Sequence, residues 1–183
     1  MKRGPKSKAT IWLFAYGSLL WEPSLFRFRH HPALLRGYHR ALCLYSFIYR
    51  GTRARPGLVL GLDRGGSCRG MVIELTGAAG KAAMKEIIAR ENVVEVYRIR
   101  DVEVTLLGGK PRRVRGVTFV ADRDHGQYAG KLSPRMVLKL LRQGKGEKGL
   151  AADYLRDTVA RLEALGIRDR ALEKIGRAVL KKN

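Results

Sequence analysis

One acidic residue of this chain, Glu91, stands where a side chain could transfer protons. Four residues of the stretch AMKEIIARE are spaced i, i+3, i+4 and i+7 and therefore share one face of a predicted helix: Met84, Ile87, Ile88 and Glu91. Glu86, in the same stretch, points to the opposite face. The pattern thus directs the Glu91 carboxylate toward the protein core.

Burial changes the chemistry expected of Glu91. Desolvation disfavours the charged form of a carboxylate, and the negative end of the helix dipole does the same, so both effects predict a raised pKa for Glu91. Such a carboxyl group can accept and return a proton near neutral pH, as a general acid and base must. In the alternative interpretation, Glu91 only ends the helix and pairs with a nearby arginine.

The stretch AYGSLLW, residues 15–21, is a second feature with functional potential. It overlaps the end of the apolar run IWLFAY, and a glycine at the end of a strand marks a place where the backbone turns tightly or approaches a ligand. Successive backbone N–H groups from Tyr16 to Leu20, together with the Ser18 hydroxyl, would form a nest for a carboxylate or an oxyanion. A simple turn after the strand is the alternative.

Several other chemistries lack their motifs in this sequence. There is no HExxH pair, the histidines form no recognisable ligand set, GQYAGKLS is one residue short of a P-loop, and Ser18 lies outside a G-x-S-x-G turn. The cysteines, Cys43 and Cys68, have neither metal-site nor redox-motif spacing and are expected to be reduced, packed thiols. The sequence therefore gives only weak support to a metal site, a nucleotide site or a serine hydrolase.

The chain has 183 residues, 45% of them hydrophobic, and a formal net charge of +21. This length predicts a single domain over residues 10–183. The basic stretch MKRGPKSK at the start predicts a flexible tail over residues 1–9. The charge favours anionic partners, but no recognition motif accompanies it, so any nucleic-acid binding is expected to be non-specific. No secretory signal or membrane-spanning run is present, which predicts a cytoplasmic protein without membrane contact. The oligomeric state cannot be read from the sequence.

The order of apolar patterns predicts an α+β fold, in which a compact sheet or barrel is packed with helices. The first half contains short strands separated by glycines: IWLFAY, HRALCLYSF, GLVLGL and CRGMVIEL. The alanine-rich stretch AAGKAAMKEIIAREN is helical in composition. After it, VYRIRDVEVTLL and RVRGVTFVA alternate as strands do, and GGKP between them predicts a hairpin turn.

The last third of the chain is predicted to be helical. Ser133 is the expected N-cap of a helix that has Pro134 at its first position and Gly144 after its end. The stretch GKGEKG is predicted to be a mobile linker to the next helix. That helix has apolar residues at roughly helical spacing, namely Leu150, Tyr154, Val159, Leu162 and Leu165, and a final basic helix starts near Asp169.

Taken in order and spacing, several stretches resemble one protein family. They are FAYGSLLW, LLRGYHR, YRGT, PGLVLGLDRGGSCRGMVIEL, the ARE at residues 89–91, and QYAGKLS. This series is similar to that of the ChaC-like γ-glutamylcyclotransferases, and the resemblance runs from about Trp12 to Leu165. It implies a small mixed β-barrel surrounded by helices, and an enzyme that splits glutathione into 5-oxoproline and cysteinylglycine without a cofactor.

The resemblance also implies roles for individual residues. Tyr16, Gly17, Ser18 and Leu19 match the loop that cradles the substrate, and Glu91 matches the catalytic acid and base. The helical pattern and the family resemblance therefore both indicate Glu91 as the general acid and base.

Two further residues match family-like stretches and are expected to contact glutathione: Arg50 in YRGT and Tyr128 in QYAG. Solvation at the surface is the alternative for Arg50, and core packing is the alternative for Tyr128. The stretch NVVEVY departs from the family pattern and introduces Glu95, which leaves the pocket shape and the γ-glutamyl substrate open.

The sequence thus predicts a glutathione-specific lyase that works by intramolecular aminolysis. Two alternatives stay open at this point. One is a cyclotransferase with the same Glu91 that acts on other γ-glutamyl amides. The other is a non-catalytic protein on the same fold that binds polyanions through its positive charge.

Overall fold

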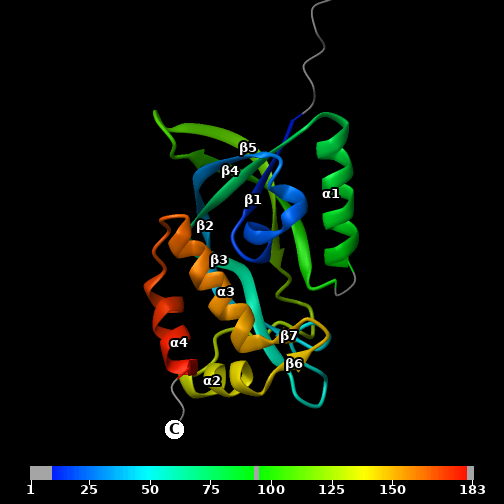
Figure 1. Cartoon of the computed structure of the whole chain (residues 1–183), viewed down its shortest axis with the longest axis vertical. Coiled ribbons are helices and arrows are strands. Elements are labelled where there is room, and N and C mark those ends of the chain that lie inside the picture. Colours follow the sequence, from blue (N-terminus) through cyan, green and yellow to red (C-terminus); the bar gives the residue numbers. More distant parts are fainter. Residues whose placement is uncertain (1–9, 93–94, 181–183) are drawn as a thin grey trace, which may run out of the picture.

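The computed structural model describes residues 10–92 and 95–180. Within these ranges five strands close into a barrel in the order β1-β3-β2-β4-β5, which confirms the predicted fold class (Figure 1). The strands are β1 (Thr10–Ala15), β2 (Arg29–Ser46), β3 (Gly57–Thr76), β4 (Tyr97–Leu106) and β5 (Arg112–Ala121). The barrel closes where β1 pairs in parallel with β5, while its other pairings are antiparallel. The basic tail predicted for residues 1–9 lies outside the described residues.

The pair β2–β3 is the longest in the barrel and corrects one prediction. The stretches GLVLGL and CRGMVIEL were expected to form two strands, but both belong to the continuous strand β3. Gly65 and Gly66 lie between them with positive φ angles of 95° and 70°, opposite Gly37 of β2, whose φ is 83°. The register shifts at this point, so the glycines allow a bulge between paired strands instead of a turn.

The helix α1 (Gly77–Asn92) follows β3 directly and lies on one side of the barrel (Figure 1). Ala83, Met84 and Ile87 are buried, whereas Glu86 is exposed, as the helical spacing predicted. The hairpin β4–β5 is also confirmed. Because Leu13, Phe14 and Ala15 of β1 are fully buried, the strand that leads into the YGSL stretch is held by the core.

Three helices gather on another side of the barrel: α2 (Pro134–Gln143), α3 (Ala151–Ala164) and α4 (Arg170–Leu180) (Figure 1). The predicted N-cap is confirmed, because the Ser133 hydroxyl accepts a hydrogen bond from the Met136 N–H. Tyr154 and Leu162 are buried on α3 as predicted, whereas Leu150 precedes the helix and is 40% exposed. Thr158 is buried instead of its predicted neighbour Val159, which is only partly buried. In the described ranges, no helix is long and apolar enough to span a bilayer.

The stretch GKGEKG is not the mobile linker that the sequence predicted. It forms a small hairpin of β6 (Lys145–Gly146) and β7 (Gly149–Leu150) that is bound to the loop after β2. The N–H groups of Glu147 and Lys148 donate to the carbonyls of Ile48 and Tyr49, both at 2.9 Å. A side chain at Gly146 would overlap this loop, since its Cβ would lie 2.2 Å from the Ile48 carbonyl oxygen. Glycine therefore serves close packing here instead of mobility.

Gly70 fixes the distance between β3 and the end of β1. A Cβ on Gly70 would lie 2.4 Å from the carbonyl oxygen of Ala15, closer than van der Waals contact allows. The two strands are paired at this point, where Ala15 lies opposite Met71. Any larger residue must therefore displace the strand end that leads into Gly17.

We expect Gly70→Ala to lower the free energy of unfolding by about 1–3 kcal/mol through this overlap. Urea unfolding followed by circular dichroism measures the change. Gly108→Ala is the matched control, because the nearest atom to its new Cβ would be 3.9 Å away in an exposed loop. Equal stability of the two variants would contradict the close approach of β3 to β1.

Candidate active site

Two adjoining pockets open at the barrel end where β1 finishes and β4 begins. The inner pocket is lined by Tyr16, Gly17, Ser18, Leu19, Leu60, Glu91, Tyr97, Phe119 and Tyr154. The larger pocket beside it, called the outer pocket here, is lined by further residues that include Trp21, Glu22, Tyr45, Tyr49, Arg50, Arg90, Gln127 and Lys148. The two pockets share Ser18, Glu91, Tyr97 and Tyr154, so they form one continuous cleft.

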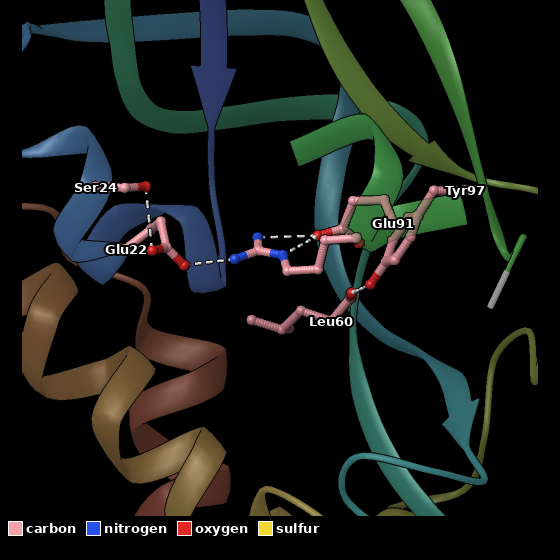
Figure 2. Close-up of polar contacts among 6 residues, drawn as sticks. Glu22, Ser24, Leu60, Glu91 and Tyr97 are labelled. Atoms are coloured by element: carbon pink, nitrogen blue, oxygen red, sulfur yellow. Dashed lines mark hydrogen bonds and ion pairs between the residues drawn. The ribbon is translucent and has the colours of Figure 1, made fainter. Parts of the chain in front are cut away.

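Glu91 lies at the junction of the inner and outer pockets, at the end of α1. Its side chain is 17% exposed, and Oε1 accepts hydrogen bonds from Nε and Nη2 of Arg90 at 3.1 and 3.0 Å (Figure 2). Among the described residues, no hydrogen bond occupies Oε2. One oxygen of the carboxylate is therefore held, and the other is left for a ligand.

Arg90 extends this contact into a chain of charged groups. Its Nη1 donates to Oε2 of Glu22, and Oε1 of Glu22 accepts a bond from the Ser24 hydroxyl at 3.2 Å (Figure 2). Glu22 follows the short 3₁₀ helix η1 (Ser18–Trp21), so Arg90 joins α1 to the YGSL loop. The ion pair proposed as the alternative for Glu91 is thus present, and it lies in the wall of the cleft.

The YGSL loop supplies backbone and small side chains to the inner pocket. Ser18 begins η1, and the first N–H groups of a helix have no carbonyl partner within the helix. The chain is held there by the Leu20 N–H, which donates to the Gly17 carbonyl at 2.9 Å. A Cβ at Gly17 would lie 3.5 Å from the Tyr154 hydroxyl, so glycine keeps the space between these two residues open.

Three tyrosines surround Glu91 and remain protonated. Burial raises the pKa of Tyr154 to about 12, and the negative charge of Glu91 contributes further. Burial likewise holds the pKa of Tyr16 and Tyr97 well above the usual range. The Tyr97 hydroxyl donates to the Leu60 carbonyl at 2.8 Å, whereas the Tyr154 hydroxyl accepts from the Leu60 N–H at 3.4 Å. Tyr154 therefore keeps its own proton available to donate.

Arg50 and Tyr128, the other two predicted contacts, have different positions. Arg50 lines the outer pocket, where Nη1 donates to the Leu150 carbonyl at 3.2 Å and the guanidinium lies 5.5 Å from the ring centre of Tyr154. Tyr128 lies outside the cleft lining, and its hydroxyl donates to Asp63 at 2.8 Å. The structure thus brings Arg50 to the cleft but not Tyr128.

The sequence interpretation missed several residues of the cleft. Tyr154 was assigned to the packing face of a helix, and Tyr97 was one member of an alternating strand. Gln127, next to the predicted Tyr128, lines the outer pocket in its place. Arg90 was part of the quoted ARE motif, and that motif was the only signal that could have pointed to it.

The cysteines and Glu95 do not line the inner or the outer pocket. Cys43 and Cys68 are free and buried, and burial raises their pKa to about 12 and about 11. Both thiols are therefore packed and protonated, as predicted. Glu95 is exposed and has a positive φ of 48° at the start of the segment leading to β4. Its neighbours Val93 and Val94, part of the predicted departure from the family, lie outside the described residues.

Comparison with solved structures finds a protein of similar fold. A crystal structure of a yeast γ-glutamyl cyclotransferase specific to glutathione superposes with a TM-score of 0.84. It is 19% identical and covers 95% of this chain and 96% of its own, which establishes the likeness of the fold alone.

Comparison of sequences finds relatives that match most of the chain. A glutathione-specific γ-glutamylcyclotransferase from Escherichia coli K12 is 30% identical over 165 residues, which are 90% of this chain and 71% of that protein. The enzyme called glutathione-specific γ-glutamylcyclotransferase 1 from Danio rerio is 29% identical over 81% of this chain and 76% of its own. The family model described as ChaC-like protein matches residues 11–182. A match over nearly the whole chain, with the cleft described above inside it, places this protein in the ChaC-like family.

Proposed function

We propose that this protein converts glutathione into 5-oxoproline and cysteinylglycine, with Glu91 as the group that moves the protons. The observation that carries the proposal is the position of Glu91, which faces both the YGSL loop of the inner pocket and the open outer pocket in a chain of the ChaC-like family. The names of the relatives from Escherichia coli and Danio rerio support glutathione as the substrate.

The reaction needs little machinery because the substrate contains its own nucleophile. The α-amine of the γ-glutamyl group attacks the γ-carbonyl carbon, a new C–N bond closes the five-membered ring, and the bond to the cysteine nitrogen breaks. No water is consumed, and two protons move from the attacking nitrogen, which starts as an ammonium group, to the leaving nitrogen, which departs as one. Well-oriented intramolecular reactions reach effective molarities on the order of 10⁵ M or more, so holding the bent substrate provides much of the catalysis.

Glu91 performs both proton transfers in this mechanism. Oε2, which Arg90 leaves free, removes one proton from the α-ammonium group before attack and a second from the same nitrogen after it. It gives both in turn to the departing nitrogen of cysteine, which leaves as an ammonium group. Arg90 acts as a positioning residue, since its two bonds to Oε1 fix the plane of the carboxylate.

The inner pocket holds the γ-glutamyl end. The N–H groups of Ser18 and Leu19, at the start of η1, and the Tyr154 hydroxyl are the donors for the developing oxyanion. Tyr16 and Gly17 shape the space around the bent chain. Arg50, whose guanidinium lies over Tyr154, meets the α-carboxylate of the same group.

Non-specific nucleic-acid binding through the net charge of +21 and a cytoplasmic location stay predictions, and neither bears on the cleft. A preference for other γ-glutamyl amides is the competing substrate assignment. Incubation of the purified protein with glutathione and, separately, with γ-glutamyl dipeptides decides between them when 5-oxoproline and the released amine are quantified. Release from the dipeptides alone would overturn glutathione as the substrate.

Glu91→Gln is expected to lower kcat for 5-oxoproline formation by about 10²–10⁴-fold, because the amide cannot exchange the proton. The thermal unfolding midpoint should stay close to that of the unchanged protein. Glu86→Gln is the matched control, since it makes the same change on the exposed face of the same helix. Near-full turnover by a folded Glu91→Gln variant would refute the proposed mechanism.

Arg90→Lys is expected to lower kcat by about tenfold, because an ammonium group retains the charge but cannot hold Oε1 at two points. The loss should appear in steady-state release of 5-oxoproline from glutathione. Arg156→Lys serves as the control, because Arg156 also bonds carboxylates on its own helix, Asp153 and Asp157, but does so on an exposed surface. If both variants kept the original kcat, Arg90 would have no positioning role.

A further inference from the structure

The hairpin β6–β7 holds one lysine at the rim of the cleft. The Lys148 N–H donates to the Tyr49 carbonyl at 2.9 Å, and the neighbouring Glu147 N–H donates to the Ile48 carbonyl. A further bond joins the Ala151 N–H to the Gly144 carbonyl across the base of the hairpin. The backbone at Lys148 is therefore fixed against the loop after β2, although its side chain is exposed to solvent.

The ammonium group of Lys148 has a defined neighbour but, within the part of the chain that the structure describes, no anionic partner. Its Nζ lies 4.2 Å from the ring centre of Tyr49, and both residues line the outer pocket. Among the ion pairs of the described residues, Lys148 takes part in none. Arg90, in contrast, is bonded to both carboxylates of this pocket, Glu22 and Glu91. Lys148 thus presents an uncompensated positive charge to whatever occupies the outer pocket.

Besides Arg90 and Lys148, Arg50 is the third cation of the outer pocket, and it forms no ion pair among the described residues. Its guanidinium stacks over Tyr154, which the two pockets share, and it bonds the Leu150 carbonyl. Tyr49, the aromatic neighbour of Lys148, lines the outer pocket. Arg50 and Lys148 therefore lie against different rings, and only the ring beside Arg50 is shared with the inner pocket.

We propose that Lys148, supported by Tyr49, binds the terminal carboxylate of the tripeptide and so selects glutathione among γ-glutamyl compounds. The inference rests on the function proposed above, in which the γ-glutamyl end lies in the inner pocket. The cysteinylglycine part then extends outward by two residues, about 7 Å of chain, through the outer pocket. A carboxylate at that end meets Lys148, which forms no ion pair among the described residues and lies against a ring of the outer pocket alone, whereas Arg50 lies against the shared Tyr154.

The test compares glutathione with its glycine amide, which has the same length but no terminal charge. The unchanged protein is expected to use glutathione with a kcat/KM about 1.5- to fivefold higher, the range of a solvent-exposed ion pair. Lys148→Gln should bring the ratio of the two kcat/KM values to about one, and Lys148→Arg should restore it. The preference should also shrink as the salt concentration rises.

Lys145→Gln is the matched control, because it removes the same charge from the exposed face of the same hairpin. A preference that survives in Lys148→Gln, or that Lys145→Gln lowers equally, overturns the assignment of Lys148. If the unchanged protein released 5-oxoproline from neither compound, the proposed function itself would fail. The assay therefore distinguishes an error in the specificity residue from an error in the reaction.

Discussion

The guanidinium of Arg90 holds together the two segments from which the cleft is built. It bonds Glu91 in its own helix and Glu22, which lies 68 positions away in the chain. Two carboxylates facing one pocket would repel each other, and the shared cation removes this repulsion while fixing both side chains. The place of the YGSL loop relative to the end of α1 depends on this contact more than on any local preference of either segment.

Features that depend on neighbours in sequence could be predicted well. The helical period set Glu91 on the same side as Met84 and Ile87, and the cap at Ser133 needed only the residues around it. The hairpin β4–β5 also follows from alternation and a turn. In each case the deciding contacts lie within a few residues, where propensity and periodicity act directly.

Features that depend on distant contacts could not be predicted in this way. The glycines of GKGEKG indicated mobility, yet Gly146 is required because the hairpin packs against the carbonyl of Ile48. Tyr154 has the spacing of a core residue, and only the closed barrel brings its hydroxyl to Leu60. Tyr128 matched the family stretch, but the bond to Asp63, which lies 65 positions earlier, holds it away from the cleft. Nothing in the local pattern separates these outcomes.

The overall charge and the cleft make different contributions to recognition. A net charge of +21 raises the local concentration of any anion and speeds its approach, but it attracts glutathione, nucleotides and inorganic anions alike. Salt screens this long-range field over about 10 Å at 0.1 M ionic strength, whereas contacts inside a partly closed pocket are screened less. Discrimination must therefore come from the short-range geometry. The carboxylates of Glu22 and Glu91 more than balance the charge of Arg90. Among the described residues of the cleft, Arg50 and Lys148 are therefore the cations left to meet the negative ends of a bound molecule.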